Sequence, residues 1–181
     1  QNSAMALFAN LIKINNTYLF DLAPVLAKPL SISAHKKDLL KEMLALLNSS
    51  ISQARFAGIR SAASISNWDI KDKKELEVLQ KMEELFQGLI ENPSDYSLLA
   101  EAANACFSLY AHLKYPDQLL LKLSEIKDPQ IQYSLAAGLW IRLKFDEYPE
   151  LYASLLMGLS TINDSKKGLV NQVEIILSDI G

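Results

Sequence analysis

Prolines at the starts of apolar segments are the feature that most constrains the fold of this chain. In its second half, a proline follows each of Asn92, Tyr115, Asp128 and Tyr148, and apolar residues then recur at three- and four-residue spacing. Proline at the first helical position costs no hydrogen bond, because its missing N–H would have no partner inside the helix. Each of these four sites therefore predicts the start of a helix.

The predicted starts recur at a regular interval. Asn92, Asp128 and Asp164 are each 36 residues apart, and Pro116 and Pro149 are 33 residues apart. A period of this length, built from helix pairs, is typical of an α-solenoid. The units would cover about residues 70–114, 115–147 and 148–181. The alternative is an irregular helical bundle, in which prolines recur because every helix needs a start.

The rest of the chain also favours helices over strands. No segment shows sustained alternation of polar and apolar residues, and the Asn-Gly and Asp-Gly pairs that mark hairpins do not occur. Six glycines in 181 residues are too few for a protein made of strands and tight turns. We therefore predict an all-α fold with seven to nine helices and no sheet.

Composition divides the chain near residue 70. Residues 5–69 are expected to form an N-terminal helical segment, continuous in one domain with repeats over residues 70–181. The formal charge changes from +3 over residues 1–70 to −6 over residues 71–181. Residues 1–4 have no structural pattern of their own and are interpreted as a cloning remnant before a native Met5.

In the N-terminal segment, a first helix is predicted from Ala4 to about Ile14. Pro24 and Pro29 are then interpreted as marking a loop, because proline interrupts helices.

Ser33 is the predicted N-cap of a long helix that begins at Ala34. This helix either continues to about Ile65 or breaks at the polar residues around Asn48.

The middle unit, "PDQLLLKLSEIKDPQIQYSLAAGLWIRL", resembles a HEAT repeat. It has a leucine-rich first helix, an Asp-Pro turn and an alanine-rich second helix. Gln132 stands near the position where HEAT units often carry an arginine or a similar polar residue. The resemblance covers residues 70–181 and implies a stack of helix pairs that binds other proteins. Tetratricopeptide repeats share the period, but their pattern of Trp, Gly and Tyr positions is not found.

The sequence contains no recognisable catalytic or cofactor-binding pattern. HExxH, GxSxG and glycine-rich phosphate loops are missing, and the two histidines, His35 and His112, stand apart from any ligand pattern. The single cysteine, Cys106, lies in an apolar run and is expected to be an inert buried thiol. We therefore expect no enzyme activity, no metal and no cofactor.

Charge and hydropathy limit the remaining classes. The net charge of −3 argues against nucleic-acid binding. No apolar run reaches the length of about 18 residues that spans a bilayer, and no signal peptide follows Met5. We expect a soluble, cytoplasmic protein, although a removed leader or a leaderless route of secretion would leave the same sequence. The oligomeric state is not indicated.

Three sets of residues are candidates for contact with a partner. The first is a basic set, in which Lys37 and Lys41 share a face of one helix; it consists of Lys36, Lys37, Lys41, Arg55 and Arg60. An aromatic set belongs either to the core between repeats or to an exposed ridge that binds a peptide; it consists of Tyr133, Trp140, Phe145, Tyr148 and Tyr152. Glu125 and Glu150 represent the acidic surface expected of the repeats. The sequence thus favours a scaffold, adaptor or inhibitor that binds a partner with a basic segment; the alternative is a small-ligand or lipid-binding helical domain.

Overall fold

The computed structural model describes residues 2–14, 21–142, 147–159, 175 and 178. This part of the chain is all-α and contains no strand, so the predicted fold class is confirmed. Its helices are α1 (Asn2–Ile14), α3 (Ala23–Ser31), α4 (Lys36–Leu47), α5 (Ser52–Ala63), α6 (Lys73–Glu91), α7 (Tyr96–Ser108), α8 (Pro116–Glu125), α9 (Pro129–Ile141) and α10 (Pro149–Leu159). None of these helices is both long and apolar enough to cross a membrane.

The helices belong to two compact units. The first contains residues 1–85 and 111–113, and the second contains residues 86–110 and 114–181. Helix α6 contributes to both, since the division falls between Leu85 and Phe86. The sequence boundaries proposed near residue 70 stay a prediction.

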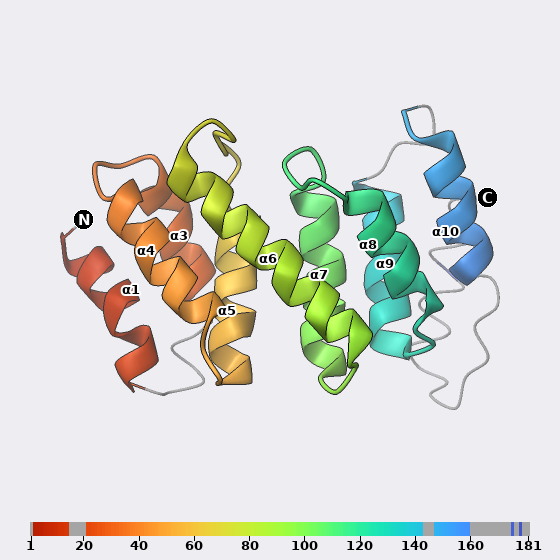
Figure 1. The fold of residues 1–181 in the computed structure, drawn as a ribbon, viewed down its shortest axis with the longest axis horizontal. Coiled ribbons are helices and arrows are strands. Elements are labelled where there is room, and N and C mark those ends of the chain that lie inside the picture. The colour runs from red at the N-terminus through yellow and green to blue at the C-terminus, as the bar shows by residue number, and fades with distance from the viewer. Residues whose placement is uncertain (1, 15–20, 143–146, 160–174, 176–177, 179–181) are drawn as a thin grey trace. The chain divides into compact units, whose positions relative to one another are not determined.

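In the first unit, α3 and α5 pack side by side and α4 packs against both of them (Figure 1). Helix α1 contacts α3 and α4. The core is formed mainly by leucines and alanines of these helices together with Met43 and Phe8, which are fully buried. Each of these helices therefore buries one apolar stripe against two or more neighbours, as amphipathic helices do in a layered domain.

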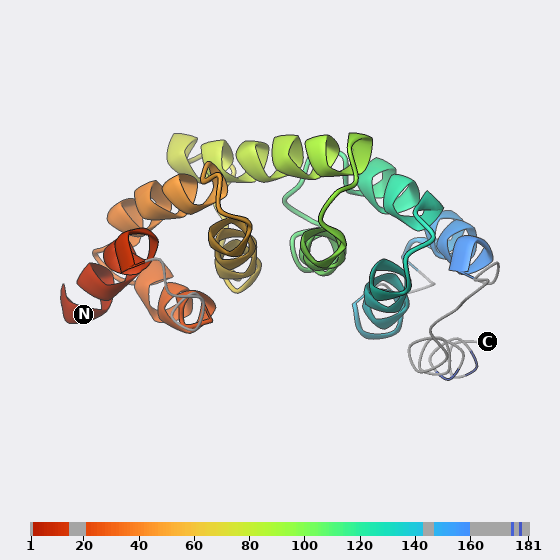
Figure 2. The same cartoon turned by 90° about the horizontal axis from the view of Figure 1, so that it is seen from below.

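In the second unit, the helices form two rows. Helices α7 and α9 pack side by side in one row, and α8 and α10 form the other (Figure 2). Helix α8 also contacts α7 and α9, so that each row covers the other. The helices of one row run in the direction opposite to those of the other row (Figure 1).

The contact between α7 and α9 is unusually close at Gly138. A Cβ atom added to Gly138 would lie 2.0 Å from Cδ2 of Phe107, whose side chain is buried. Real Cβ atoms are not found at such a distance, so only glycine allows this approach of the two helices. The buried alanines Ala102, Ala103 and Ala136 keep the side chains of this row small as well.

We predict that Gly138→Ala lowers the free energy of unfolding by about 1–3 kcal/mol, because the added methyl group must displace the Phe107 ring. Gly88→Ala is the matched control, since a Cβ at this exposed helical position meets no atom within 4 Å. It should raise the stability by about 0.5–1 kcal/mol through helix propensity alone. Chemical denaturation measures both changes. Stabilisation by both substitutions would contradict the close approach.

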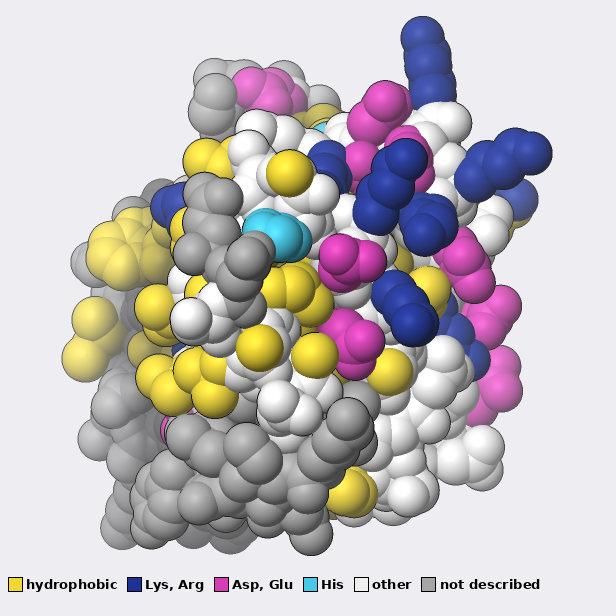
Figure 3. Space-filling view, turned by 90° about the vertical axis from the view of Figure 1, so that its left-hand side faces the viewer, with side chains coloured by type: hydrophobic (Ala, Val, Ile, Leu, Met, Phe, Trp, Pro, Cys, Tyr) yellow, Lys and Arg dark blue, Asp and Glu magenta, His cyan; other side chains and the backbone are white. Residues whose placement is uncertain are grey.

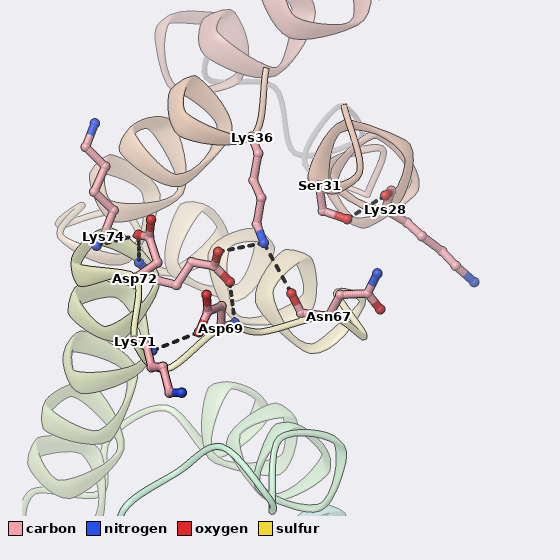
Figure 4. A network of polar contacts seen from close by, with 9 residues as sticks. Lys28, Ser31, Lys36, Asn67, Asp69, Lys71, Asp72 and Lys74 are labelled. Atoms are coloured by element: carbon pink, nitrogen blue, oxygen red, sulfur yellow. Dashed lines mark hydrogen bonds and ion pairs between the residues drawn. The ribbon is translucent and has the colours of Figure 1, made fainter. Parts of the chain in front are cut away.

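A polar network joins the start of α4 to the first turn of α6 and to the segment that precedes α6. Lys36 Nζ lies 2.6 Å from Glu75 Oε1 and donates to the backbone oxygen of Asn67 at 3.2 Å (Figure 4). Glu75 is 4% exposed, and its other carboxylate oxygen accepts from the backbone N–H of Asp69 at 2.8 Å. The carboxylate is thus satisfied although it is buried, as a buried charge must be.

Removal of Lys36 should therefore be costly, because it leaves the buried Glu75 carboxylate without its cation. We predict that Lys36→Ala lowers the free energy of unfolding by about 1–3 kcal/mol. The neighbouring Lys37 is exposed, and Lys37→Ala should change stability by less than about 0.5 kcal/mol. Equal effects of the two substitutions in urea denaturation would show that the network adds nothing to stability.

Three of the four predicted proline starts are confirmed. Helices α8, α9 and α10 begin at Pro116, Pro129 and Pro149. The Asp128 side chain caps α9 by accepting from the backbone N–H groups of Gln130 and Ile131, as expected of an N-cap.

The start predicted at Asn92 and Pro93 is wrong by a few residues. Helix α7 begins at Tyr96, because the Asp95 carboxylate accepts from Leu98 N at 2.9 Å and takes the capping role. The start predicted at Asp164 lies outside the described residues.

The N-terminal segment departs more from the prediction. The expected loop at Pro24 and Pro29 is a helix, α3, with Pro29 in its interior. Pro29 has no N–H to donate to the carbonyl of Val25. Both residues are exposed, so water can donate a hydrogen bond to that carbonyl instead.

The long helix expected after Ser33 starts two residues late and is broken. Ser33 accepts from the backbone N–H of His35 instead of capping at Ala34, and α4 begins at Lys36. The break occurs at Asn48, as one of the two alternatives held, because the Asn48 amide donates to the Leu44 carbonyl at 2.9 Å and ends α4.

Candidate functional site

The predicted basic set does not form a uniform basic surface in the first unit. Lys36 forms an ion pair with Glu75. Arg60 lies over the ring of Phe56, with its Cζ atom 5.5 Å from the ring centroid. Lys37 and Lys41 are exposed on α4, with the exposed Asp38 between them in sequence. Basic and acidic side chains intermingle on this face of the molecule (Figure 3). Contact of Lys37 and Lys41 with a partner stays a prediction.

A shallow groove of about 320 Å³ lies beside Lys41, between α1 and α4. Apolar side chains of α1 form one wall. Ionisable side chains of α4 and of His35, which precedes it, form the other, and Figure 3 shows apolar and charged side chains side by side on this face. The lining residues are Met5, Ala6, Ala9, His35, Asp38, Lys41 and Glu42.

The aromatic set is not part of the fully buried core. Trp140 is 56% exposed and Tyr148 is 37% exposed, whereas Tyr133 and Tyr152 are half-buried. Burial raises the pKa of the Tyr152 phenol above its ordinary value of 10.0. The remaining member of the set, Phe145, lies outside the described residues. The two alternatives, core packing and an exposed ridge, therefore apply to different residues: Trp140 and Tyr148 are exposed, whereas Tyr133 and Tyr152 are half-buried.

Two residues that the sequence did not single out complete a cluster around Tyr148. Tyr110 follows α7, and its hydroxyl donates to Oδ1 of Asp117 in the first turn of α8. The rings of Tyr110 and Tyr148 meet edge-on, with centroids 4.8 Å apart and an interplanar angle of 68°. We call Tyr110, Asp117 and Tyr148 the tyrosine–aspartate cluster. It brings together the end of α7 and the starts of α8 and α10.

The cluster changes the acidity of Tyr110. Burial raises the pKa of its phenol well above the ordinary value of 10.0, and the hydrogen bond to the Asp117 carboxylate and the charge of that carboxylate raise it further. Both effects favour the neutral phenol, which can donate to a carboxylate, over the phenolate, which cannot.

The α8–α10 row exposes acidic residues at both ends of α8 and at the start of α10. Asp117 and Glu150 occupy the first turns of α8 and α10, and Glu125 ends α8. All three are exposed. The second unit as a whole has twelve acidic and seven basic residues in the sequence, a formal charge of −5, while the first unit has +2. The predicted acidic positions Glu125 and Glu150 therefore lie on the outer side of the α8–α10 row.

The opposite row of the second unit carries a separate, smaller groove. It has a volume of about 190 Å³ and lies between α7 and α9, over Phe107 and Gly138. Its rim includes Arg142 and the exposed Ile141. No pattern in the sequence predicted this groove, because it lies between residues that only the packing of α7 on α9 brings together.

No set of three or more His, Cys, Asp or Glu side chains in the part of the chain that the structure describes is placed to hold a metal ion. Cys106 is fully buried, as predicted.

Comparison with protein-family models, curated proteins and solved structures found no match.

The tyrosine–aspartate cluster predicts a specific dependence of stability on pH. The unfolded chain ionises its tyrosines near pH 10, whereas folded Tyr110 ionises at higher pH. The hydrogen bond therefore stabilises the fold fully below about pH 10 and is lost as the pH rises through the raised pKa. We expect Tyr110→Phe to be destabilising at about pH 8 and to differ less from the wild type at about pH 11.

Urea denaturation at several pH values measures this difference. Tyr96→Phe, at an exposed tyrosine of α7, is the control for the loss of one phenol hydroxyl. A gap between wild type and Tyr110→Phe that stays constant up to pH 11 would contradict the assigned hydrogen bond.

Proposed function

We propose that this protein is a non-catalytic protein–protein interaction module, a scaffold, adaptor or inhibitor, that binds a basic segment of its partner. The observation that carries the proposal is the α8–α10 row, which exposes acidic side chains beside the partly exposed Tyr148. Tyrosine is enriched at the energetically important centres of interfaces, and opposite charges steer partners together.

Two features of the second unit support a HEAT-like helix pair as the scaffold for this surface. Helices of the same kind lie side by side, α7 with α9 and α8 with α10. The buried Gln132 amide donates to the carbonyls of Ser124 and Ile126, which ties the end of α8 to α9. Gln132 stands near the position where HEAT units often have a polar side chain, and it acts here between the two helices of one pair. A cytoplasmic location stays a prediction from the sequence.

Charge reversal tests the proposal. In a pull-down, the wild type should bind partner proteins at about 50 mM salt and release them at about 500 mM salt. The double variant Glu125→Lys and Glu150→Lys should no longer bind these proteins. The association rate of a captured partner should fall steeply over the same range, because electrostatic steering is screened. Glu77→Lys with Glu84→Lys makes the same charge change at exposed positions of α6 and should keep the partner.

Two results would overturn the proposal. One is a partner whose binding depends neither on salt nor on Glu125 and Glu150. The other is capture of acidic proteins alone. Circular dichroism of each variant establishes that the fold is retained.

A small-ligand or lipid-binding function is the second candidate, and the groove between α1 and α4 favours it. Its volume of about 320 Å³ lies at the lower end of the range for ligand pockets, about 300–1,000 Å³. However, one wall consists of His35, Asp38, Lys41 and Glu42, whereas such pockets have mainly apolar walls. The protein-binding function is therefore the better supported of the two.

A further inference from the structure

The two helices of the α8–α10 row begin with the same three-residue pattern. Tyr115-Pro116-Asp117 opens α8 and Tyr148-Pro149-Glu150 opens α10, 33 residues later. The two helices pack side by side and run in the same direction (Figure 1). The pattern therefore places a tyrosine and a carboxylate at the same end of both helices.

At the first of these patterns, the chain supplies a cation of its own. Lys114 Nζ lies over the ring of Tyr115, 4.8 Å from its centroid. Such a position over the ring face is attractive, because the face carries the negative part of the ring quadrupole. The residue before Tyr148, in contrast, is Glu147. The second pattern has the same tyrosine and carboxylate with an acidic residue where the first has lysine.

We propose that the tyrosine–aspartate cluster holds a lysine or arginine side chain of the partner's basic segment, against the ring of Tyr148 and the carboxylate of Asp117. This inference rests on the proposed function and names the residues that would make its central contact.

The geometry of the cluster suits this role. A carboxylate accepts several hydrogen bonds, and Tyr110 uses one of them. That bond and the edge-on contact with Tyr110 fix the carboxylate and the Tyr148 ring before a ligand arrives. Groups that are already fixed lose little conformational freedom on binding, which favours affinity. In an edge-on pair, moreover, the contact leaves a face of each ring unused, and Tyr148 is partly exposed.

The inference can be tested with the full chain and a fluorescent peptide of alternating arginine and glycine, whose binding is followed by anisotropy at about 50 mM salt. Asp117→Asn and Tyr148→Leu should each weaken binding about three- to tenfold. Tyr148→Phe keeps the ring and should bind nearly as well as the wild type. The matched controls are Glu91→Gln and Tyr96→Leu, which change an exposed carboxylate and an exposed tyrosine elsewhere in the second unit.

The outcomes separate this inference from the proposed function. If Asp117→Asn and Tyr148→Leu act no more strongly than their controls, while reversal of Glu125 and Glu150 abolishes peptide binding, the cluster is not the contact and the acidic row still binds the partner. If the wild type binds this peptide no better than one of alternating glutamine and glycine, the inference is wrong, and the capture experiment with Glu125 and Glu150 decides on the proposed function separately.

Discussion

The close contact between α7 and α9 is the constraint on which the second unit depends. Gly138 lets the backbone of α9 reach the Phe107 ring, and no other residue type fits there without movement. Helix α8 packs against both members of this pair, and α10 packs against α8 and α9. The positions of the outer helices therefore follow from the inner pair. The first unit contains a milder version of the same constraint, since a Cβ on Gly58 of α5 would lie 3.1 Å from Leu46 and Leu47 of α4.

Long polar side chains complete the packing at the helix ends. The last carbonyls of a helix have no partner inside it and need one from elsewhere. The Gln132 amide supplies donors to the end of α8, and Lys127 Nζ donates to the carbonyls of Ser124 in α8 and Gly158 in α10. In the first unit, the ion pair of Lys36 and Glu75 joins the start of α4 to the first turn of α6. Small residues thus set how closely the helices pack, and these side chains set how their ends are joined.

The parts of the fold that could be predicted are those decided by local chemistry. Asp128 and Pro129 start a helix because capping and a preset backbone angle act within a few residues. Where two local signals competed, the sequence did not decide between them. Asp95 caps α7 although Asn92 was the predicted start. Residues around Pro29 are helical although proline favoured a loop. Glu125 and Glu150 were expected at the surface because residues 71–181 have a formal charge of −6, and both are exposed. The contact of Tyr110 with Asp117 and Tyr148 could not be predicted from the sequence, because Tyr148 is 38 residues from Tyr110 and is brought to it only by the packing of the helices between them.

Helix formation explains the carboxylates on the acidic surface of the second unit, but it does not explain the tyrosines beside them. A carboxylate in the first turn of a helix is favoured by the helix dipole, which accounts for Asp117 in α8 and Glu150 in α10. Because the two helices are neighbours and start at the same end, this local rule places two carboxylates on one edge of the row. No comparable rule calls for the tyrosines: the Tyr115 side chain makes no capping hydrogen bond, and a tyrosine before the first proline adds nothing to the helix start. Tyr148 and Tyr110 are thus the members of this surface that helix formation does not explain. Recognition of a cation by the Tyr148 ring and the Asp117 carboxylate, held in place by Tyr110, is the role that we propose for them.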